Sequence, residues 1–176
     1  MVDGRLKGNR NENTVARELS VWVSPDLERH KFRTCPVSSL VFRRKPAAND
    51  NVVTDWVGGW DVIHSPRYAF PFCVEAKAVE GWSFDELLTA RRGPLAKWWE
   101  QTKHQSAGKN LWPMLIFTAK RKPDYVMVER DQGAMLSFNL ISRLHDVAVT
   151  PLAQLVAVSA AATARVLQEP FGLLEP

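Results

Sequence analysis

The sequence predicts an α/β fold with a central mixed β-sheet flanked by helices. Two observations lead to this fold class. Apolar residues recur at helical spacing near the start and in the middle of the chain, and short runs rich in Phe, Val and Ile lie between these stretches. The resulting order is helix, about three strands, helix, strand and strand, which places helices against a sheet of mixed direction.

The first expected element is a helix over Asn9–Val23, and a Ser-Pro pair directly after it supplies its stop. At roughly 100° per residue, Glu12 falls near the middle of the apolar stripe of this helix, whereas Glu18 lies well off it. We therefore expect Glu12 to point toward the interior. The stripe consists of Val15, Ala16, Leu19, Trp22 and Val23.

Five segments have the composition of strands, with β-branched and aromatic residues in short runs. Between the third and the fourth, Ser83 and Glu86 have the spacing of a capping box, and Gly93-Pro94 opens a helix that runs to Gly108. The expected strands are His30–Cys35, Trp60–Ile63, Phe70–Lys77, Met114–Thr118 and Tyr125–Glu129.

The length of 176 residues and the hydrophobic content of 45% suit one domain over residues 1–176 better than two domains. Residues 37–53 combine basic side chains with Pro and an Asn-Asp-Asn run, so we expect a mobile basic loop there. Residues 151–170 are rich in Ala, Val and Leu and predict a C-terminal helical extension.

Composition argues against several classes of protein. The first residues are polar and basic and no run of about eighteen apolar residues occurs, so we expect no secretory signal, no membrane span and a cytoplasmic location. Cys35 and Cys73 lie in expected strands and the four histidines are scattered singly, which favours reduced, packed thiols over a zinc site. A disulfide would need an oxidising compartment that nothing in the sequence indicates.

The formal net charge of +4 conceals an acidic centre between two basic blocks. Acidic residues outnumber basic ones over residues 50–89, whereas basic residues predominate over residues 1–49 and 90–123. This pattern suits a protein whose carboxylates hold cations while Lys and Arg contact phosphates. Charge runs are equally typical of solvated surface, so the charge alone does not decide between the two interpretations.

A carboxylate and an ammonium share one face of the expected strand Phe70–Lys77. Residues two apart in a strand face the same side, so Cys73, Glu75 and Lys77 point in one direction. Asp61 begins the apolar stretch of the neighbouring strand, and a Ser-Pro turn lets the two strands pair as a hairpin. Asp61 and Glu75 can therefore meet across the pair.

Such a set of residues fits phosphodiester hydrolysis, which needs hard oxygen ligands for Mg²⁺, an activated water and positive charge near the transition state. Asp61, Glu75 and the backbone carbonyl of Ala76 can supply the ligands, with Mn²⁺ as a substitute ion. Lys77 can hold the attacking water and offset the developing negative charge. Glu12 can complete the metal shell or bind a second ion.

The runs WDVI and FCVEAK together resemble the D-x(n)-E-x-K core of the PD-(D/E)xK nuclease superfamily, which implies a restriction-endonuclease-like fold. The KGxxxE pattern that ends at Glu12 resembles the archaeal-type Holliday-junction resolvases and their phage relatives. The resemblance also assigns Gln101, on the helix after ExK, to the site, with Gln105 as a weaker match. The remaining catalytic residues that it implies are Glu12, Asp61, Glu75 and Lys77.

Three alternatives stay open at these positions. Trp60 stands where relatives often have Gly or Pro before the aspartate, which leaves Asp55 as a substitute for Asp61. Glu12 has the spacing of an ordinary capping box with Asn9. An isolated ExK is often an exposed charge pair, although the apolar flanks here favour a buried strand, where an unpaired Glu would be costly.

The resemblance further implies a basic residue and a serine after the first strand, and Arg33 with Ser38 or Ser39 matches them. Each basic residue here, and the basic run Ala119–Lys122, by itself indicates only solvated charge, and only in combination do they indicate DNA contacts. The basic loop is the first place where we expect phosphate contacts. The residues expected to contact DNA are Lys7, Arg10, Arg33, Ser38, Ser39, Arg43, Arg44 and Lys45.

The function expected from these residues and this resemblance is a Mg²⁺-dependent DNA endonuclease. The resemblance narrows the activity to a Holliday-junction resolvase of recombination and repair, phage-encoded and acting in a bacterial host, that cuts four-way junctions as a homodimer. Neither a membrane partner nor a small-molecule cofactor is expected. The alternatives are another PD-(D/E)xK DNA nuclease, of restriction, repair or exonuclease type, and a catalytically silent DNA-binding protein on the same fold.

Overall fold

The structure is a computed structural model, and it describes part of the chain. The described residues are 4–23, 42–44, 57–58, 62–64, 70–89, 93–109, 111–119, 121–136, 138, 140–142 and 146–157. Within residues 4–10, 42–44, 57–58 and 62–64 the description covers the backbone and not the side chains.

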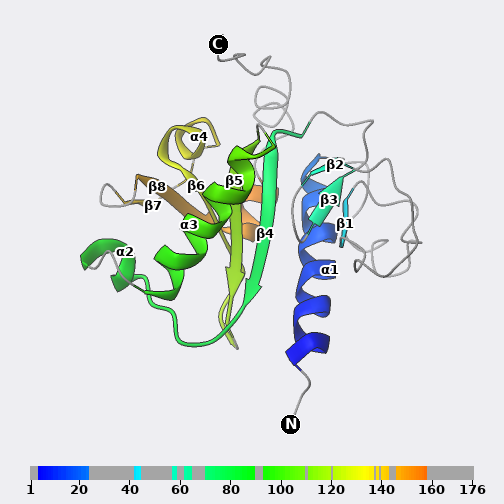
Figure 1. Ribbon diagram of the computed structural model, residues 1–176, viewed down its shortest axis with the longest axis horizontal. Helices are drawn as coiled ribbons and strands as arrows, with labels where there is room; N and C mark the ends of the chain where they lie inside the picture. The colour runs from blue at the N-terminus through cyan, green and yellow to red at the C-terminus, as the bar shows by residue number, and fades with distance from the viewer. Residues whose placement is uncertain are drawn as a thin grey trace.

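Helices flank a mixed sheet, as the sequence predicts, so the α/β fold class is confirmed (Figure 1). The helices are α1 (Gly4–Val23), α2 (Asp85–Thr89), α3 (Pro94–Ala107), α4 (Arg130–Met135) and α5 (Leu152–Ala157). The strands are β1 (Phe42–Arg44), β2 (Val57–Gly58), β3 (Val62–His64), β4 (Phe72–Ala78), β5 (Trp112–Thr118), β6 (Tyr125–Glu129), β7 (Leu140–Ser142) and β8 (Val147–Pro151).

The sheet is ordered β1-β3-β4-β5-β6-β8-β7, with β2 paired to β3 off this path. Strands β4 and β5 are parallel and are joined by a crossover that contains α2 and α3, while the other described pairs are antiparallel. Strands β3 and β4 pair through Val62 and Val74. This antiparallel pair is the hairpin expected ahead of the ExK motif.

Two apolar clusters cover the two faces of the sheet. Alternate residues of β5 show the division, because Met114 and Ile116 belong to the cluster that contains α1, whereas Leu115 and Phe117 belong to the cluster that contains α3. Figure 1 shows α1 on one side of β4 and α3 on the other. The central strands are therefore buried on both faces.

Local sequence signals set the ends of the helices around the crossover. Gly93 adopts a φ of 156° and is followed by Pro94 at the first turn of α3, where the missing N–H of proline leaves no hydrogen bond unmade. The hydroxyl of Ser83 accepts a hydrogen bond of 3.2 Å from the backbone N–H of Asp85, which caps α2. The side chain of Glu86, the other half of the expected capping box, lies outside the described residues.

Most expected elements agree with the structure. Helix α1 ends at Val23, as predicted, and begins at Gly4, ahead of the expected start. The strands expected at Phe70–Lys77, Met114–Thr118 and Tyr125–Glu129 correspond to β4, β5 and β6. Cys73 is buried in β4 as a reduced thiol.

Two expectations need correction or lie beyond the described residues. The predicted basic loop over residues 37–53 is wrong at Phe42–Arg44, which forms β1 and pairs with β3. Charged residues are common on edge strands, so basic composition alone does not separate this strand from a loop. The strand expected at His30–Cys35, and the helical extension beyond residue 157, fall outside the part of the chain that the structure describes.

Strands β7 and β8 and the short helix α4 are elements that the sequence did not predict. Strand β8 pairs along its whole length with β6, and β7 pairs with β8, so these strands extend the sheet on the side away from β4. Among the described helices, none combines the length and the apolar character that a bilayer span needs.

Candidate active site

Glu75 lies near the middle of β4 and is 3% exposed. Its register partner on β5 is Leu115, which belongs to the cluster on the α3 side of the sheet. Register partners of a parallel pair face the same side, so the carboxylate faces α3. The intervening residues Val74 and Ala76 belong to the opposite cluster with α1, as the alternation within FCVEAK predicts.

Two further side chains reach the Glu75 carboxylate from this side. The Lys77 ammonium forms an ion pair with Glu75 Oε1, as expected for residues two apart on one strand. Gln101 Nε2, on α3, donates a hydrogen bond of 3.2 Å to the same oxygen. The structure thus brings together three of the residues that the sequence assigns to catalysis, although Glu75 and Gln101 are 26 positions apart.

The arrangement holds a buried charge in a fixed position. A buried carboxylate is strongly disfavoured unless it is paired and hydrogen-bonded, and Lys77 and Gln101 supply both kinds of contact. The Lys77 side chain is 22% exposed and Gln101 is exposed, so this side of the pair borders solvent. A carboxylate, an ammonium and an amide therefore meet at the border between the core and the surface.

Helix α3 is positioned for this contact by its own apolar side. Leu95 and Trp99 are buried in one cluster with Leu115 and Phe117. Gln101 lies two positions after Trp99 and so projects from a different side of the helix. Gln105, the weaker match, is half-buried one turn further along. The hydrogen bond to Glu75 comes from Gln101.

Glu12 lies on α1 and is half-buried. Val15, Ala16 and Leu19, which follow it at helical spacing, are fully buried. They pack in the cluster on the face of β4 opposite to Glu75. The apolar side of α1 therefore packs on β4 from the face opposite to the Glu75–Lys77 pair.

The other expected site residues cannot be placed to the same extent. Those outside the described residues are Asp61, its alternative Asp55, Arg33, Ser38, Ser39 and Lys45. For Lys7 and Arg10 on α1, and for Arg43 and Arg44 on β1, the structure describes the backbone position only.

The donor atoms on β4 are of the kind that a hard divalent cation prefers. They are the Glu75 carboxylate and the backbone carbonyl of Ala76, both oxygens on a strand whose neighbours are buried. Over the described ranges, no three His, Cys, Asp or Glu side chains gather as a metal site. Two oxygen donors of this kind fit a hard divalent cation, which needs further oxygen ligands to fill its shell.

A neighbouring feature was not expected from the sequence. The indole of Trp82, which follows β4, packs edge-to-face on Phe117 with ring centroids 4.9 Å apart. The Lys122 ammonium lies 4.0 Å from the centroid of the same indole. The run AKRK indicates charge in the sequence but not this contact, because Lys122 and Trp82 are 40 positions apart.

Comparison with known proteins identifies a family for this chain. The family model described as "Phage putative PDDEXK endonuclease" matches residues 3–153, which include α1, the ExK strand β4, the glutamine helix α3 and the strands that follow. No curated protein and no solved structure matches the chain.

Proposed function

The chain belongs to the phage PDDEXK endonuclease family, and from this membership we propose that the protein is a divalent-metal-dependent endonuclease that cuts branched DNA. The most specific form of the proposal is a Holliday-junction resolvase that acts as a homodimer. The observation that carries it is the buried Glu75 carboxylate, contacted on one oxygen by both Lys77 and Gln101.

The proposed metal ligands are Glu75, the Ala76 carbonyl and Asp61, with Glu12 completing the shell or holding a second ion. When bound, Mg²⁺ supplies Lewis-acid stabilisation of the negative charge on the scissile phosphate. The contacts of Lys77 and Gln101 with Oε1 restrain the rotation of the Glu75 carboxylate. Restrained rotation keeps the ligand oxygens in place during the reaction.

Lys77 has a second proposed task. Its ammonium holds the attacking water and offsets the negative charge that develops on the phosphate as the oxygen of the water bonds to phosphorus. The bond from phosphorus to the leaving oxygen then breaks, and the proton that the water loses is balanced, through solvent, by the proton that the leaving oxygen gains. Because Lys77 is partly exposed beside a buried carboxylate, it can contact both the core and a bound phosphate.

The register of β3 supports Asp61 as the second acidic ligand. Val62 pairs with Val74 in the antiparallel direction, so continuing this register by one residue pairs position 61 with position 75. Directly opposed residues have side chains on the same face of a sheet. Asp55 precedes β2 in the sequence, so the register of β3 with β4 gives no such support to it.

The branched substrate is supported by the N-terminal part of the chain. The KGxxxE pattern lies within α1, and the resemblance to junction resolvases assigns its glutamate, Glu12, to the site. Junction resolution needs two cuts at symmetric positions, and a homodimer with one site in each protomer supplies them. The homodimer is thus proposed because junction resolution needs two symmetric cuts.

Cleavage of a labelled four-way junction, compared with a linear duplex and with single-stranded DNA of matched sequence, tests the proposal. We expect Mg²⁺-dependent cuts in the junction, at paired positions, and little cleavage of the other two substrates. Equal cleavage of the duplex would favour a restriction or repair endonuclease, and release of single nucleotides would favour an exonuclease. DNA binding with no cleavage in Mg²⁺ or Mn²⁺ would indicate a catalytically silent protein.

A further inference from the structure

The turn between β5 and β6 carries two exposed cations, Arg121 and Lys122. We propose that this turn binds the phosphate backbone of the DNA strand that is being cut and holds the strand in register with Lys77. The inference rests on the proposed function and adds a second DNA-contacting segment to it, far in sequence from the basic residues near β1.

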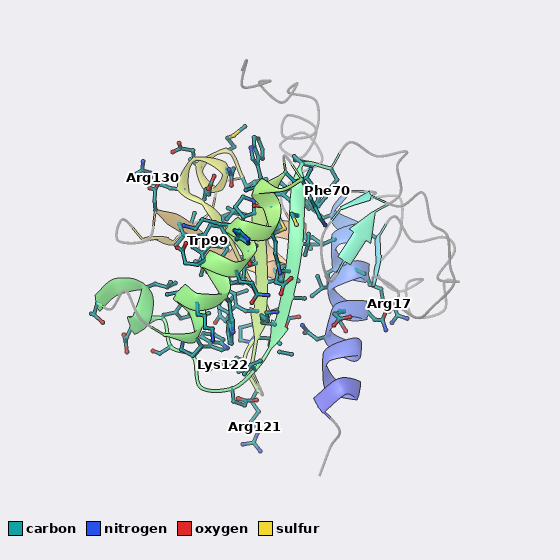
Figure 2. All side chains as sticks on the ribbon, viewed as in Figure 1. Arg17, Phe70, Trp99, Arg121, Lys122 and Arg130 are labelled. Atoms are coloured by element: carbon teal, nitrogen blue, oxygen red, sulfur yellow. The ribbon has the colours of Figure 1, made fainter. Side chains whose placement is uncertain are left out.

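The position of the turn follows from the sheet. Strands β4 and β5 are parallel, and Lys77 pairs with Phe117 close to the end of both strands. The carboxyl ends of the two strands therefore lie side by side, and the turn after β5 begins next to the end of β4. Figure 2 shows Arg121 and Lys122 at this end of the sheet, with Arg121 projecting away from the body of the protein.

A chain of direct contacts links Lys122 to the ExK strand on the Glu75 side of the sheet. Phe117, the register partner of Lys77, lies in the cluster on the α3 side and contacts Trp82. The Lys122 ammonium lies over the Trp82 ring and also donates a hydrogen bond of 3.4 Å to the Trp82 carbonyl. These contacts place Lys122 on the α3 side of the sheet, near the end of the strand that carries Lys77.

The turn itself has a defined backbone. The N–H of Lys122 donates a hydrogen bond of 3.0 Å to the carbonyl of Ala119. Arg121 has a φ of 62°, a left-handed conformation that is uncommon outside Gly, Asn and Asp. Gly or Asn would fit this position with less strain, so an arginine occupies a position whose backbone disfavours it.

Neither cation is neutralised within the described part of the chain. The ion pairs found there join Lys77 to Glu75, Lys103 to Glu100, and Arg130 to Asp131 and Asp146. Among these described pairs, none joins Asp124, the acidic residue of the same turn, to Arg121 or Lys122. The planar guanidinium of Arg121 can bind a phosphate in bidentate fashion, and Lys122 adds a point charge.

The test compares two double variants in which the same amount of charge is removed. Arg121→Asn with Lys122→Gln removes the proposed contact, and asparagine tolerates the left-handed conformation. Lys109→Ala with Arg130→Ala removes two cations elsewhere, since Lys109 precedes β5 at the opposite end of the sheet and Arg130 begins α4 (Figure 2). All proteins carry Glu75→Gln to prevent cleavage. Fluorescence anisotropy measures their affinity for a labelled four-way junction between roughly 50 and 300 mM NaCl, a range over which the Debye length falls by about half.

We expect the Arg121→Asn, Lys122→Gln variant to lower the slope of log affinity against log salt by about 1.8, because each phosphate contact contributes about 0.9. Its affinity near 0.1 M salt should fall at least about tenfold, and the control pair should keep the parent slope. Arg121→Asn alone should lower the slope by about 0.9. This single variant leaves the Lys122–Trp82 contact in place, so it still tests the proposal if Lys122→Gln lowers the melting temperature.

A kinetic measurement separates strand binding from a structural role. In the otherwise intact enzyme, the turn variant should raise KM for junction cleavage and leave kcat within about twofold, since the proposed phosphate contact is made equally in the ground state and the transition state. An unchanged slope in a variant of a parent that binds DNA would overturn this inference and leave the proposed function standing. A parent that shows no salt-dependent DNA binding would overturn both.

Discussion

Glu75 is an acid and is almost fully buried. Burial disfavours its carboxylate unless neighbouring groups contact it. Lys77 and Gln101 compensate by contacting the same oxygen. Removing one of them leaves a buried group without part of its hydrogen bonding, which costs roughly 1–3 kcal/mol. The same residues are therefore expected to affect both catalysis and the stability of the fold. Their variants have to be measured for cleavage rate and for melting temperature.

Glu75→Gln and Lys77→Ala are each expected to abolish cleavage while DNA affinity changes by no more than a few-fold. These residues serve the chemical step, whereas phosphate contacts dominate affinity. Single-turnover cleavage and equilibrium binding, measured on the same preparations, check the prediction. Thermal melting provides the control: Glu75→Gln keeps the shape of the side chain and should melt close to the wild type. Parallel losses of binding and cleavage would contradict the assignment.

Asp61→Asn should remove metal-dependent activity, and Asp55→Asn should be tolerated. A metal ligand has to be held rigidly, and Asp61 directly precedes β3, whereas two glycines separate Asp55 from that strand. Cleavage measured over a Mg²⁺ titration distinguishes the two variants. The opposite result, an inactive Asp55→Asn and an active Asp61→Asn, would move the acidic ligand to the segment before β2.

At the scale of elements, strand β1 changes how the basic segment can act. Arg43 and Arg44 lie on a strand paired to β3, one strand away from β4, and not on a loop. The backbone of both residues is therefore held in the sheet by its pairing with β3.

Neutralising Arg43, Arg44 and Lys45 together is expected to weaken junction binding and to flatten its dependence on salt. Each phosphate contact that the substitutions remove should lower the slope of log affinity against log salt by about 0.9 on duplex DNA. Single variants at 43 and 44, titrated with salt, identify which residue carries the contact, and an unchanged slope in the triple variant would exclude this segment.

Helix α4 packs on β8 at a point where no side chain fits. A Cβ atom at Gly133 would lie 2.1 Å from the Cβ of Ala148, which is fully buried. Gly133→Ala should therefore destabilise the fold by about 1–3 kcal/mol through overpacking. Gly108→Ala is the matched control, since Gly108 has a φ of −66° and open space around its Cα. Denaturant unfolding of both variants tests the difference, and equal stabilities would mean that α4 is loosely packed.

Signals within single elements predicted much of this architecture. The period of two within FCVEAK places Glu75 and Lys77 on one face, and helical spacing identifies α1 and α3. The short strands β1, β7 and β8 could not be predicted because their pairing with β3 and β6 decides them, and local composition does not. The same holds for the Lys122–Trp82 contact, which depends on the crossover.

At the scale of the whole molecule, the sheet is covered on both faces, and the Glu75 site lies under α3 on one of them. The resemblance assigns Glu12 to the same site, although α1 packs on the other face. The contact that would bring Glu12 to the Glu75 site is therefore not supplied by the apolar packing of α1, and its place in the metal shell rests on the resemblance.

Mixed dimers provide a test of the proposed assembly. Wild-type protein and a tagged Glu75→Gln variant, unfolded together and refolded, should form heterodimers that cut one strand of a junction and leave the symmetric strand intact. Nicked junctions should accumulate in proportion to the heterodimer fraction, as measured on denaturing and native gels. A protein that is monomeric in sedimentation and still makes paired cuts would contradict the homodimer.

The parallel pairing of β4 with β5 also determines the point during translation at which the site can fold. The register joins Phe72 to Trp112, so the strand that carries Glu75 and Lys77 gains its second neighbour, β5, only after the whole crossover has been translated. Gln101 lies within that crossover. Chains fold as they emerge from the ribosome, and a nascent chain that ends before residue 112 has the ExK motif without the elements that fix it. A growing or prematurely terminated chain should thus be harmless to the DNA of the cell that makes it.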